Sequence, residues 1–356
     1  SLFGVNYLTA MIISAIVIVA YTTLGGFLAA STTDFIQSII MSVALIVVLI
    51  FGVETAGGIG AVIHNASELP GYLSMTLSYD VNTGKAAPYS ALTIVSTAAW
   101  GLGYFGMPHI LLRFMAIEDE KKLKLSRRVA TIWVVISLFV AVFIGVIGYT
   151  MSKVGALEML TGSNSETIIV KISALLSQHG VIFALLAGVI LAGILASTMS
   201  TSDSQLLAAS SAVSSDILGA FRKDSSNKNG SMAAARITLL VISVVAAFIA
   251  RNPDSSVFAI VSFAWAGFGA AFGPVVLFSL FWKRTNKWGA LAGMVCGGSM
   301  VFIWKYLIRP LGGIWNIYEL LPAFLIACAA IVIVSLLTPK PSKEIEEEFD
   351  RVAQMK

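Results

Sequence analysis

Of the 356 residues, 57% are apolar and 12% are charged, and the mean hydropathy is +0.88. This composition excludes an ordinary soluble globular protein, and apolar runs of about 20 residues, enough to cross a bilayer, recur along the chain. The net charge of +4 does not indicate nucleic acid binding, because the basic residues gather in short loops between apolar runs. The sequence therefore predicts an all-α protein that crosses the lipid bilayer several times.

The apolar runs predict nine spanning helices, at about residues 7–30, 34–53, 91–116, 129–152, 180–218, 234–250, 257–282, 288–308 and 316–338. Residues 1–338 would then form one transmembrane domain and residues 339–356 a tail. Most lysines and arginines lie in the tail and in the loops after odd-numbered segments, so the first residue is predicted outside and the tail in the cytoplasm. The chain begins without methionine and directly enters an apolar run, so we expect further helices upstream.

The segments between the spans carry weaker signals. Ser31-Thr-Thr-Asp34 predicts a helix N-cap, with Asp34 near the positive end of the helix dipole. Residues 54–90 are rich in glycine and proline, and we expect an outside loop with room for a surface helix. Residues 154–178 are expected to form a second outside loop, and residues 219–232 a short inside loop.

The third segment contains the run Trp100-Gly-Leu-Gly-Tyr-Phe-Gly-Met-Pro-His109. Because glycine and proline are poor helix formers, this run predicts a break at membrane depth. A break leaves backbone N–H and carbonyl groups without helical hydrogen bonds, which is tolerated at that depth only inside protein or beside a water-filled cavity. Broken helices of this kind form substrate sites in secondary transporters. Trp100 and Tyr104 would share one face and form an aromatic wall. A kink with packed aromatic side chains is the alternative.

The fifth segment contains a polar run within residues 191–207. Four hydroxyls at helical spacing line one face, with Asp203 on its edge: Ser197, Ser200, Thr201 and Ser204. An aspartate near mid-membrane costs roughly 2.5–3.5 kcal/mol on insertion scales and usually marks a site. A row of oxygens with one carboxylate suits a hard cation such as sodium. Close helix packing through small hydroxyl residues is the alternative.

The later segments favour packing roles. Ala266, Ala270 and Gly273 recur about every fourth residue and predict a close-packing face, with a gate as the alternative, and Pro274 is expected to bend that helix. Cys296 and Cys328 lie in apolar runs without metal-ligand spacing and are interpreted as packing residues.

Three of these runs together resemble the sodium:solute symporter family, and within it the bacterial sodium/proline symporters. They are Trp100–Ile110, Met199–Leu207 and Ser262–Leu277, and the stretch Thr23–Asp34 resembles the family further upstream. The resemblance covers essentially the whole chain. It implies the LeuT-like inverted-repeat transporter fold, in which residues of about 91–282 would be the second repeat and the first two segments the end of the first.

The resemblance also implies site residues. A co-transported sodium ion would bind the hydroxyls of Ser200 and Thr201 and the backbone oxygen of Ser197. A second sodium site, present in some members, would use Asp34, Asp203 and Ser204, and at Asp34 ion contact and capping can coexist. Positions matching Trp100, Tyr104 and Pro108 are implicated in the substrate pocket of proline carriers.

The function implied by this resemblance is secondary active transport in the bacterial cell membrane, with sodium entry driving uptake of a small amino acid, L-proline, by alternating access. No enzyme activity, nucleic acid binding or obligate protein partner is expected. A sodium-coupled carrier of another small solute and a transporter-like solute sensor are the alternatives. An intramembrane hydrolase is disfavoured, because the run with Asp203 has neither a histidine base nor an identifiable oxyanion donor.

Overall fold

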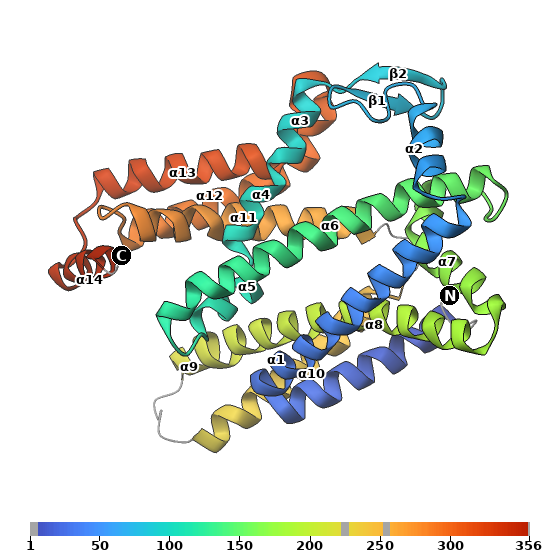
Figure 1. Ribbon diagram of the computed structural model, residues 1–356. Helices are drawn as coiled ribbons and strands as arrows, with labels where there is room; N and C mark the ends of the chain where they lie inside the picture. Colours follow the sequence, from blue (N-terminus) through green and yellow to red (C-terminus); the bar gives the residue numbers. More distant parts are fainter. Residues whose placement is uncertain (1–5, 222–227, 252–256, 355–356) are drawn as a thin grey trace. The chain divides into compact units, whose positions relative to one another are not determined.

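A computed structural model describes residues 6–221, 228–251 and 257–354 (Figure 1). Its helices are α1 Tyr7–Thr55, α2 Ile59–Ser67, α3 Ala91–Ala98, α4 Trp100–Gly103, α5 Pro108–Met115, α6 Leu123–Lys153, α7 Ile168–Leu176, α8 Val181–Ser211, α9 Leu218–Phe221, α10 Lys228–Ile249, α11 Val257–Phe281, α12 Lys287–Ile303, α13 Leu320–Leu337 and α14 Lys343–Gln354. Strands β1 Leu77–Asp80 and β2 Lys85–Pro88 pair in one small sheet. Short 3-10 or π-helical turns lie at Tyr104–Gly106, Glu120–Lys122, Gly162–Thr167, Ser177–His179, Ala212–Ile217, Trp304–Ile308, Arg309–Leu311 and Gly313–Trp315.

By length and composition, seven helices of the described residues can cross a membrane. The nine expected ranges are largely helical, and two features explain why the structure has seven such helices among the described residues and not nine. The first two ranges are joined within the 49 residues of α1. The third, 91–116, is divided among α3, α4, a 3-10 turn and α5, each of which is too short to span a bilayer alone.

Gly26 divides α1 into two halves. Its φ of 59° and ψ of −151° lie outside the helical region, in a conformation that only glycine adopts without strain. Figure 1 shows the two blue halves running in opposite directions. The predicted N-cap at Asp34 is wrong, because the chain turns earlier and residues 31–34 lie inside the second half. The hydroxyls of Thr32 and Thr33 accordingly donate to backbone carbonyls of the preceding helical turn.

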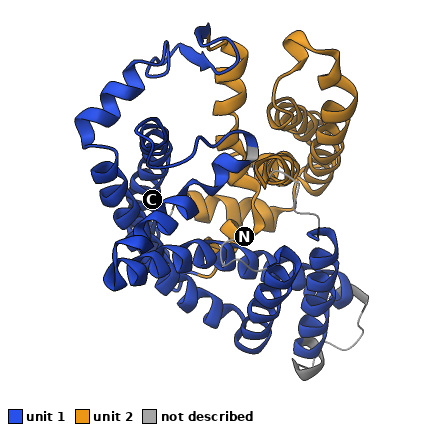
Figure 2. Cartoon of the chain, turned by 90° about the vertical axis from the view of Figure 1, so that its right-hand side faces the viewer, with its two compact units in different colours: residues 1–87, 117–254 blue, residues 88–116, 255–356 orange. Residues whose placement is uncertain are grey.

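The chain forms two compact units, drawn in different colours in Figure 2. Unit 1 consists of residues 1–87 and 117–254, and unit 2 of residues 88–116 and 255–356. The broken segment 91–116 therefore belongs to the same unit as α11, α12 and α13. Residues 222–227, in the expected inside loop 219–232, lie outside the described part of the chain.

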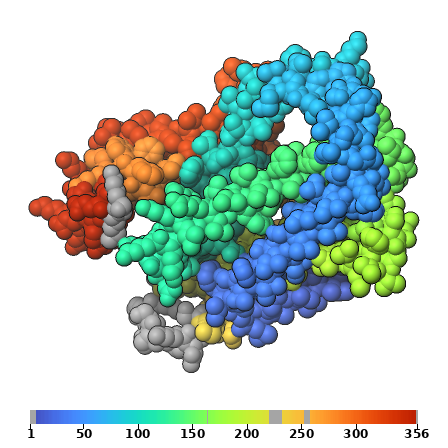
Figure 3. Space-filling view, in the orientation of Figure 1, coloured from blue at the N-terminus to red at the C-terminus, as the bar shows by residue number. Residues whose placement is uncertain are grey.

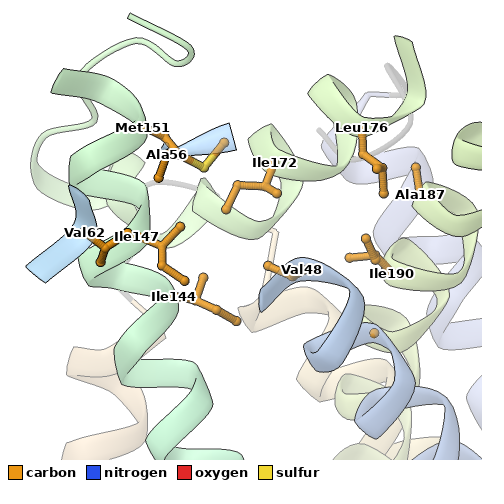
Figure 4. Close-up of a cluster of buried hydrophobic side chains, with 11 residues drawn as sticks. Val48, Ala56, Val62, Ile144, Ile147, Met151, Ile172, Leu176, Ala187 and Ile190 are labelled. Atoms are coloured by element: carbon orange, nitrogen blue, oxygen red, sulfur yellow. The ribbon is translucent and has the colours of Figure 1, made fainter. Parts of the chain in front are cut away.

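The core of unit 1 lies between α1, α6, α7 and α8 (Figure 4). Its fully buried side chains include Val48, Ile147 and Ile190. The second half of α1 and α6 run side by side (Figures 1 and 3), and the Trp133 indole donates to the Ser42 hydroxyl at 3.0 Å. Small residues set the helix spacing, since a Cβ added at Gly193 would lie 2.8 Å from Cβ of Ala44.

The two expected outside loops are more ordered than predicted. In residues 54–90 the surface helix is confirmed as α2, and the pair of strands was not foreseen. In residues 154–178 the loop prediction is wrong, because α7 places Ile172 and Leu176 in the core. Lys153 pairs with Glu68 just after α2, and the lysine holds the pKa of that exposed carboxyl below its ordinary value.

Unit 2 packs through small residues, as the sequence predicted for α11. Ala266 and Ala270 are fully enclosed, and a Cβ added at Gly297 of α12 would overlap the carbonyl of Ala270. The α11 helix continues on both sides of Pro274. The amide of Asn286 donates to the Thr338 hydroxyl and the Pro339 carbonyl, which attaches the start of the tail to the loop after α11.

Candidate functional site

Asp203 lies fully enclosed within the spanning helix α8. The hydroxyl of Tyr21, from the first half of α1, donates to Asp203 Oδ2 at 2.8 Å. The neighbouring Ser204 hydroxyl donates to the Ser200 carbonyl at 2.9 Å and shares its proton with Asp203 Oδ1 at 3.2 Å. A buried carboxylate requires such donors or a cation, because removing an unpaired charge from water is very costly. The two hydroxyls therefore hold Asp203 in place.

Asp34 adds a second carboxyl group to this cluster. It is half-buried on the second half of α1, and it lies near enough to Asp203 and Tyr21 to interact with them electrostatically. The reversal at Gly26 is what brings residues from both halves of α1 to the same part of α8. Two carboxylates near one another repel unless a proton or a cation compensates for the charge. We call Tyr21, Asp34, Asp203 and Ser204 the carboxylate cluster.

Gln37 lies near the carboxylate cluster and was not among the predicted site residues. It is 9% exposed, and its side-chain Oε1 is enclosed and receives no hydrogen bond from the described residues. Gln37 follows Asp34 by three residues and so shares its helical face. Asp34 and Gln37 form a polar pair at i and i+3 in the sequence, but such pairs are too common to indicate a site unless their burial is known.

The three predicted ligands of the first sodium ion lie together in unit 1. The Ser200 and Thr201 hydroxyls both donate to the Ser197 carbonyl, each at 3.1 Å. Burial differs along the run, since Ser200 is half-buried whereas Ser197 and Thr201 are exposed on the described chain. Hydroxyl groups in helices commonly make such bonds to preceding carbonyls, so this geometry suits both ion binding and helix packing.

The chemistry of the available ligands also limits the kind of cation. Within residues 6–221, 228–251 and 257–354, no three His, Cys, Asp or Glu side chains are grouped so that they could hold a metal ion. The remaining candidate ligands for a cation are hydroxyl and carbonyl oxygens together with one or two carboxylates. Such donor sets suit hard cations and disfavour soft transition metals.

The predicted break in the third segment is confirmed. After α4 and the 3-10 turn Tyr104–Gly106, Met107 is extended with φ −80° and ψ 112°, and α5 then begins at Pro108. Proline is favoured at the first helical position because its missing N–H would have no partner there. Met107 is 5% exposed, so this irregular backbone is inside unit 2.

Trp100 and Tyr104 meet at Trp265 of α11. The Trp100 ring stacks on Trp265 with centroids 5.5 Å apart, and Tyr104 contacts the same indole edge-on at 4.7 Å. Trp265 Nε1 donates to the Trp100 carbonyl at 2.9 Å. Tyr104 is 46% exposed and Pro108 is half-buried. Trp265 lies in the run Ser262–Leu277, for which close packing was predicted, and its contacts with Trp100 and Tyr104 were not foreseen.

The candidate residues thus form two separate sets. Every predicted sodium ligand lies in unit 1, and Trp100, Tyr104 and Pro108 all lie in unit 2.

Comparison with known proteins agrees with the predicted family. A family model described as the sodium:solute symporter family matches residues 1–297. An osmoregulated proline transporter of Bacillus subtilis is 38% identical over 343 residues, which cover 96% of this chain and 66% of that protein. A sodium/proline symporter of Salmonella typhimurium is 38% identical over 350 residues, which cover 98% of this chain and 66% of that protein. The chain spans about two thirds of the length of these relatives.

The fold agrees as well. The solved structure of a sodium-coupled sialic acid symporter, in a substrate-bound outward-open state, matches with a TM-score of 0.74 and 18% identity, covering 95% of this chain and 68% of that one. This match confirms the predicted transporter fold, whereas the number of spans and the upstream helices stay predictions. Since the family model covers most of the chain and the relatives are 38% identical, this chain belongs to the sodium:solute symporter family.

Proposed function

We propose that this protein couples inward sodium movement to the uptake of L-proline by alternating access. The observation that carries the proposal is the carboxylate cluster, in which the enclosed Asp203 is held by Tyr21 and Ser204 beside Asp34. An intramembrane carboxylate is expensive and indicates an ion pathway by default. Proline is proposed because both relatives described above are named as proline transporters.

Sodium occupies two oxygen-rich positions in this proposal. The first uses the Ser197 carbonyl and the Ser200 and Thr201 hydroxyls. The second uses Asp34, Asp203 and Ser204, and the Tyr21 oxygen faces the same carboxylate. The enclosed Gln37 oxygen, on the face of Asp34, supplies a further acceptor without a donor among the described residues.

The membrane potential and the sodium gradient supply the driving force. One charge crossing 100 mV releases about 2.3 kcal/mol, and a tenfold sodium gradient adds about 1.4 kcal/mol. Together they sustain roughly 500-fold accumulation for one sodium ion per substrate. Coupling requires that sodium binds one conformation of the transporter better than the other. A cation in the carboxylate cluster would stabilise the conformation in which both halves of α1 lie against α8.

In this proposal, proline binds against the broken helix of unit 2. Trp100 and Tyr104 supply an aromatic wall for the apolar ring of proline, and Pro108 starts the helix after the break. The N-terminus of that helix carries partial positive charge, which suits the carboxylate of a zwitterion.

The protein spans the membrane several times, and we place it in the bacterial cell membrane. The excess of basic residues in alternate loops supports an outside first residue and a cytoplasmic tail that includes α14. Residues 1–338 form the transmembrane domain in this proposal, with the second repeat at about 91–282.

The test of this function is uptake of radiolabelled proline by proteoliposomes that contain the protein expressed from its complete gene. Proline should accumulate when sodium is present outside and a negative inside potential is imposed. Replacing sodium by potassium or choline should abolish accumulation. Sodium-independent proline uptake would contradict the coupling, and the absence of proline uptake with sodium-driven entry of another solute would contradict the substrate.

Asp203→Asn should raise the sodium concentration for half-maximal uptake roughly 10-fold or more, because a charge-assisted contact contributes about 1.5–3 kcal/mol. Tyr21→Phe should have a smaller effect, because it leaves the charge of Asp203 and its contact with the Ser204 hydroxyl in place. Asp216→Asn is the matched control, since Asp216 lies beyond the same helix and is exposed. Sodium dependence in Asp203→Asn equal to that of the control would contradict a role for the cluster.

A further inference from the structure

Tyr318 lies just before α13 and joins three elements of unit 2. Its backbone N–H donates to the Ser96 hydroxyl of α3 at 3.1 Å, and its own hydroxyl donates to the Ser262 carbonyl of α11 at 2.6 Å. Its ring stacks on Trp100 with centroids 6.0 Å apart and an interplanar angle of 16°. Tyr318 is therefore fixed at its backbone, at its ring and at its hydroxyl.

The segment that carries Tyr318 is itself held in place. The next residue, Glu319, is 1% exposed, and its Oε2 accepts a hydrogen bond from Arg309 Nη1 at 2.8 Å. Arg309 Nε also donates to Asn316 Oδ1 at 3.0 Å. The indole of Trp304 donates to the carbonyl of Ile317 at 3.2 Å. Arg309 thus bonds to both Asn316 and the buried Glu319 on the two sides of Tyr318, and these contacts with the Trp304 bond hold the segment that presents Tyr318.

Three rings pack near the Trp100 indole, and all are nearly parallel to it. Phe258 stacks at 5.6 Å and 11°, Trp265 at 5.5 Å and 16°, and Tyr318 at 6.0 Å and 16°. Phe258 and Trp265 both belong to α11. Tyr318 is the ring that comes from a separate segment and is independently anchored. Removing it would leave the Trp100 indole without one of its stacking partners.

We propose that Tyr318 is a positioning residue for the substrate wall, because it sets the orientation in which Trp100 meets the substrate. The proposal rests on the proposed function, in which Trp100 contacts proline. It extends the determinants of substrate affinity to a segment outside the expected second repeat of about 91–282.

The experiment compares Tyr318→Leu with Tyr318→Phe in sodium-driven proline uptake. Tyr318→Leu should raise the half-saturating proline concentration about 2- to 12-fold, the range for losing one aromatic pair, while sodium activation at saturating proline stays within about twofold. Tyr318→Phe keeps the ring and should change the proline requirement less. Tyr306→Leu is the control, because Tyr306 is 60% exposed and its ring lies against Phe263.

A double substitution separates positioning from general damage. If Tyr318 acts through Trp100, then Tyr318→Leu should add little to the effect of Trp100→Leu on the proline requirement. Additive effects, or an unchanged proline requirement in Tyr318→Leu, would overturn the inference while leaving sodium-driven uptake intact. An equal loss of proline and sodium dependence would also overturn it, since that pattern marks misfolding. Failure of the unsubstituted protein to take up proline is a different result and overturns the proposed function itself.

Discussion

Replacing Ser200 and Thr201 together by alanine is expected to raise the sodium concentration for half-maximal uptake by at least about 100-fold. Each hydroxyl oxygen that contacts a cation is comparable to a hydrogen bond to a charged group, which contributes about 1.5–3 kcal/mol. The fold should change little, because both hydroxyls donate only to the Ser197 carbonyl of their own helix among the hydrogen bonds of the described residues. The measurement is the sodium dependence of proline uptake in proteoliposomes.

Thr198 and Ser202 provide the matched control for this pair. They are of the same residue types, lie on the same helix and make the same kind of bond, since Thr198 donates to the Ile194 carbonyl and Ser202 to the Thr198 carbonyl. At 100° per residue, Ser202 lies roughly 150° and Thr198 roughly 110° from the middle of the face formed by Ser197, Ser200 and Thr201, so both lie off that face. Their double alanine variant should keep normal sodium dependence. If both double variants behave alike, the hydroxyls serve helix packing and the first sodium position is wrong.

Gly106→Ala is expected to prevent stable folding of unit 2 and so to abolish uptake. A Cβ at Gly106 would overlap the Phe268 carbonyl and lie 2.8 Å from the Gly273 nitrogen and 2.9 Å from the Gly269 Cα. All three are backbone atoms of α11, which cannot rotate away as a side chain does. Overpacking costs roughly 1–3 kcal/mol where side chains can adjust, and more is expected here.

Gly101→Ala is the control for the same segment. Gly101 is exposed, and a Cβ added there meets no atom within 4 Å. Alanine in a helix is about 1 kcal/mol more favourable than glycine, so this variant should be as stable as the unsubstituted protein or more so. The two variants are compared by their thermal unfolding in detergent and by their proline uptake. A Gly106→Ala protein that melts and transports like Gly101→Ala would contradict the close approach of the broken segment to α11.

The sequence by itself determined the features that depend on neighbouring residues. Hydropathy over about 20 residues located the long apolar helices, and the glycines and proline after Trp100 located the break, because both properties are set within a few helical turns. The spacing of Ser197, Ser200 and Thr201 placed their oxygens together for the same reason, and the structure has them at hydrogen-bond distance. The motifs also sufficed to identify the family.

Local signals failed where a distant contact or a single backbone angle decided the outcome. The cap predicted at Asp34 assumed that a helix starts there, but the positive φ of Gly26 had already turned the chain. The stretch containing α7 was expected to be part of an outside loop, but it forms a helix. Its burial depends on the core formed by α1, α6 and α8.

Only the tertiary structure decided which side chains meet. Tyr21 and Asp203 are separated by 182 positions, and Tyr318 and Ser96 by 222. A sequence pattern states which face of a helix is polar, but the partner of that face depends on how the chain reverses and which helices pack together. The pairing of α1 with α8 and of the broken segment with α11 is therefore a property of the folded chain, since close packing selects contacts by shape across long sequence separations.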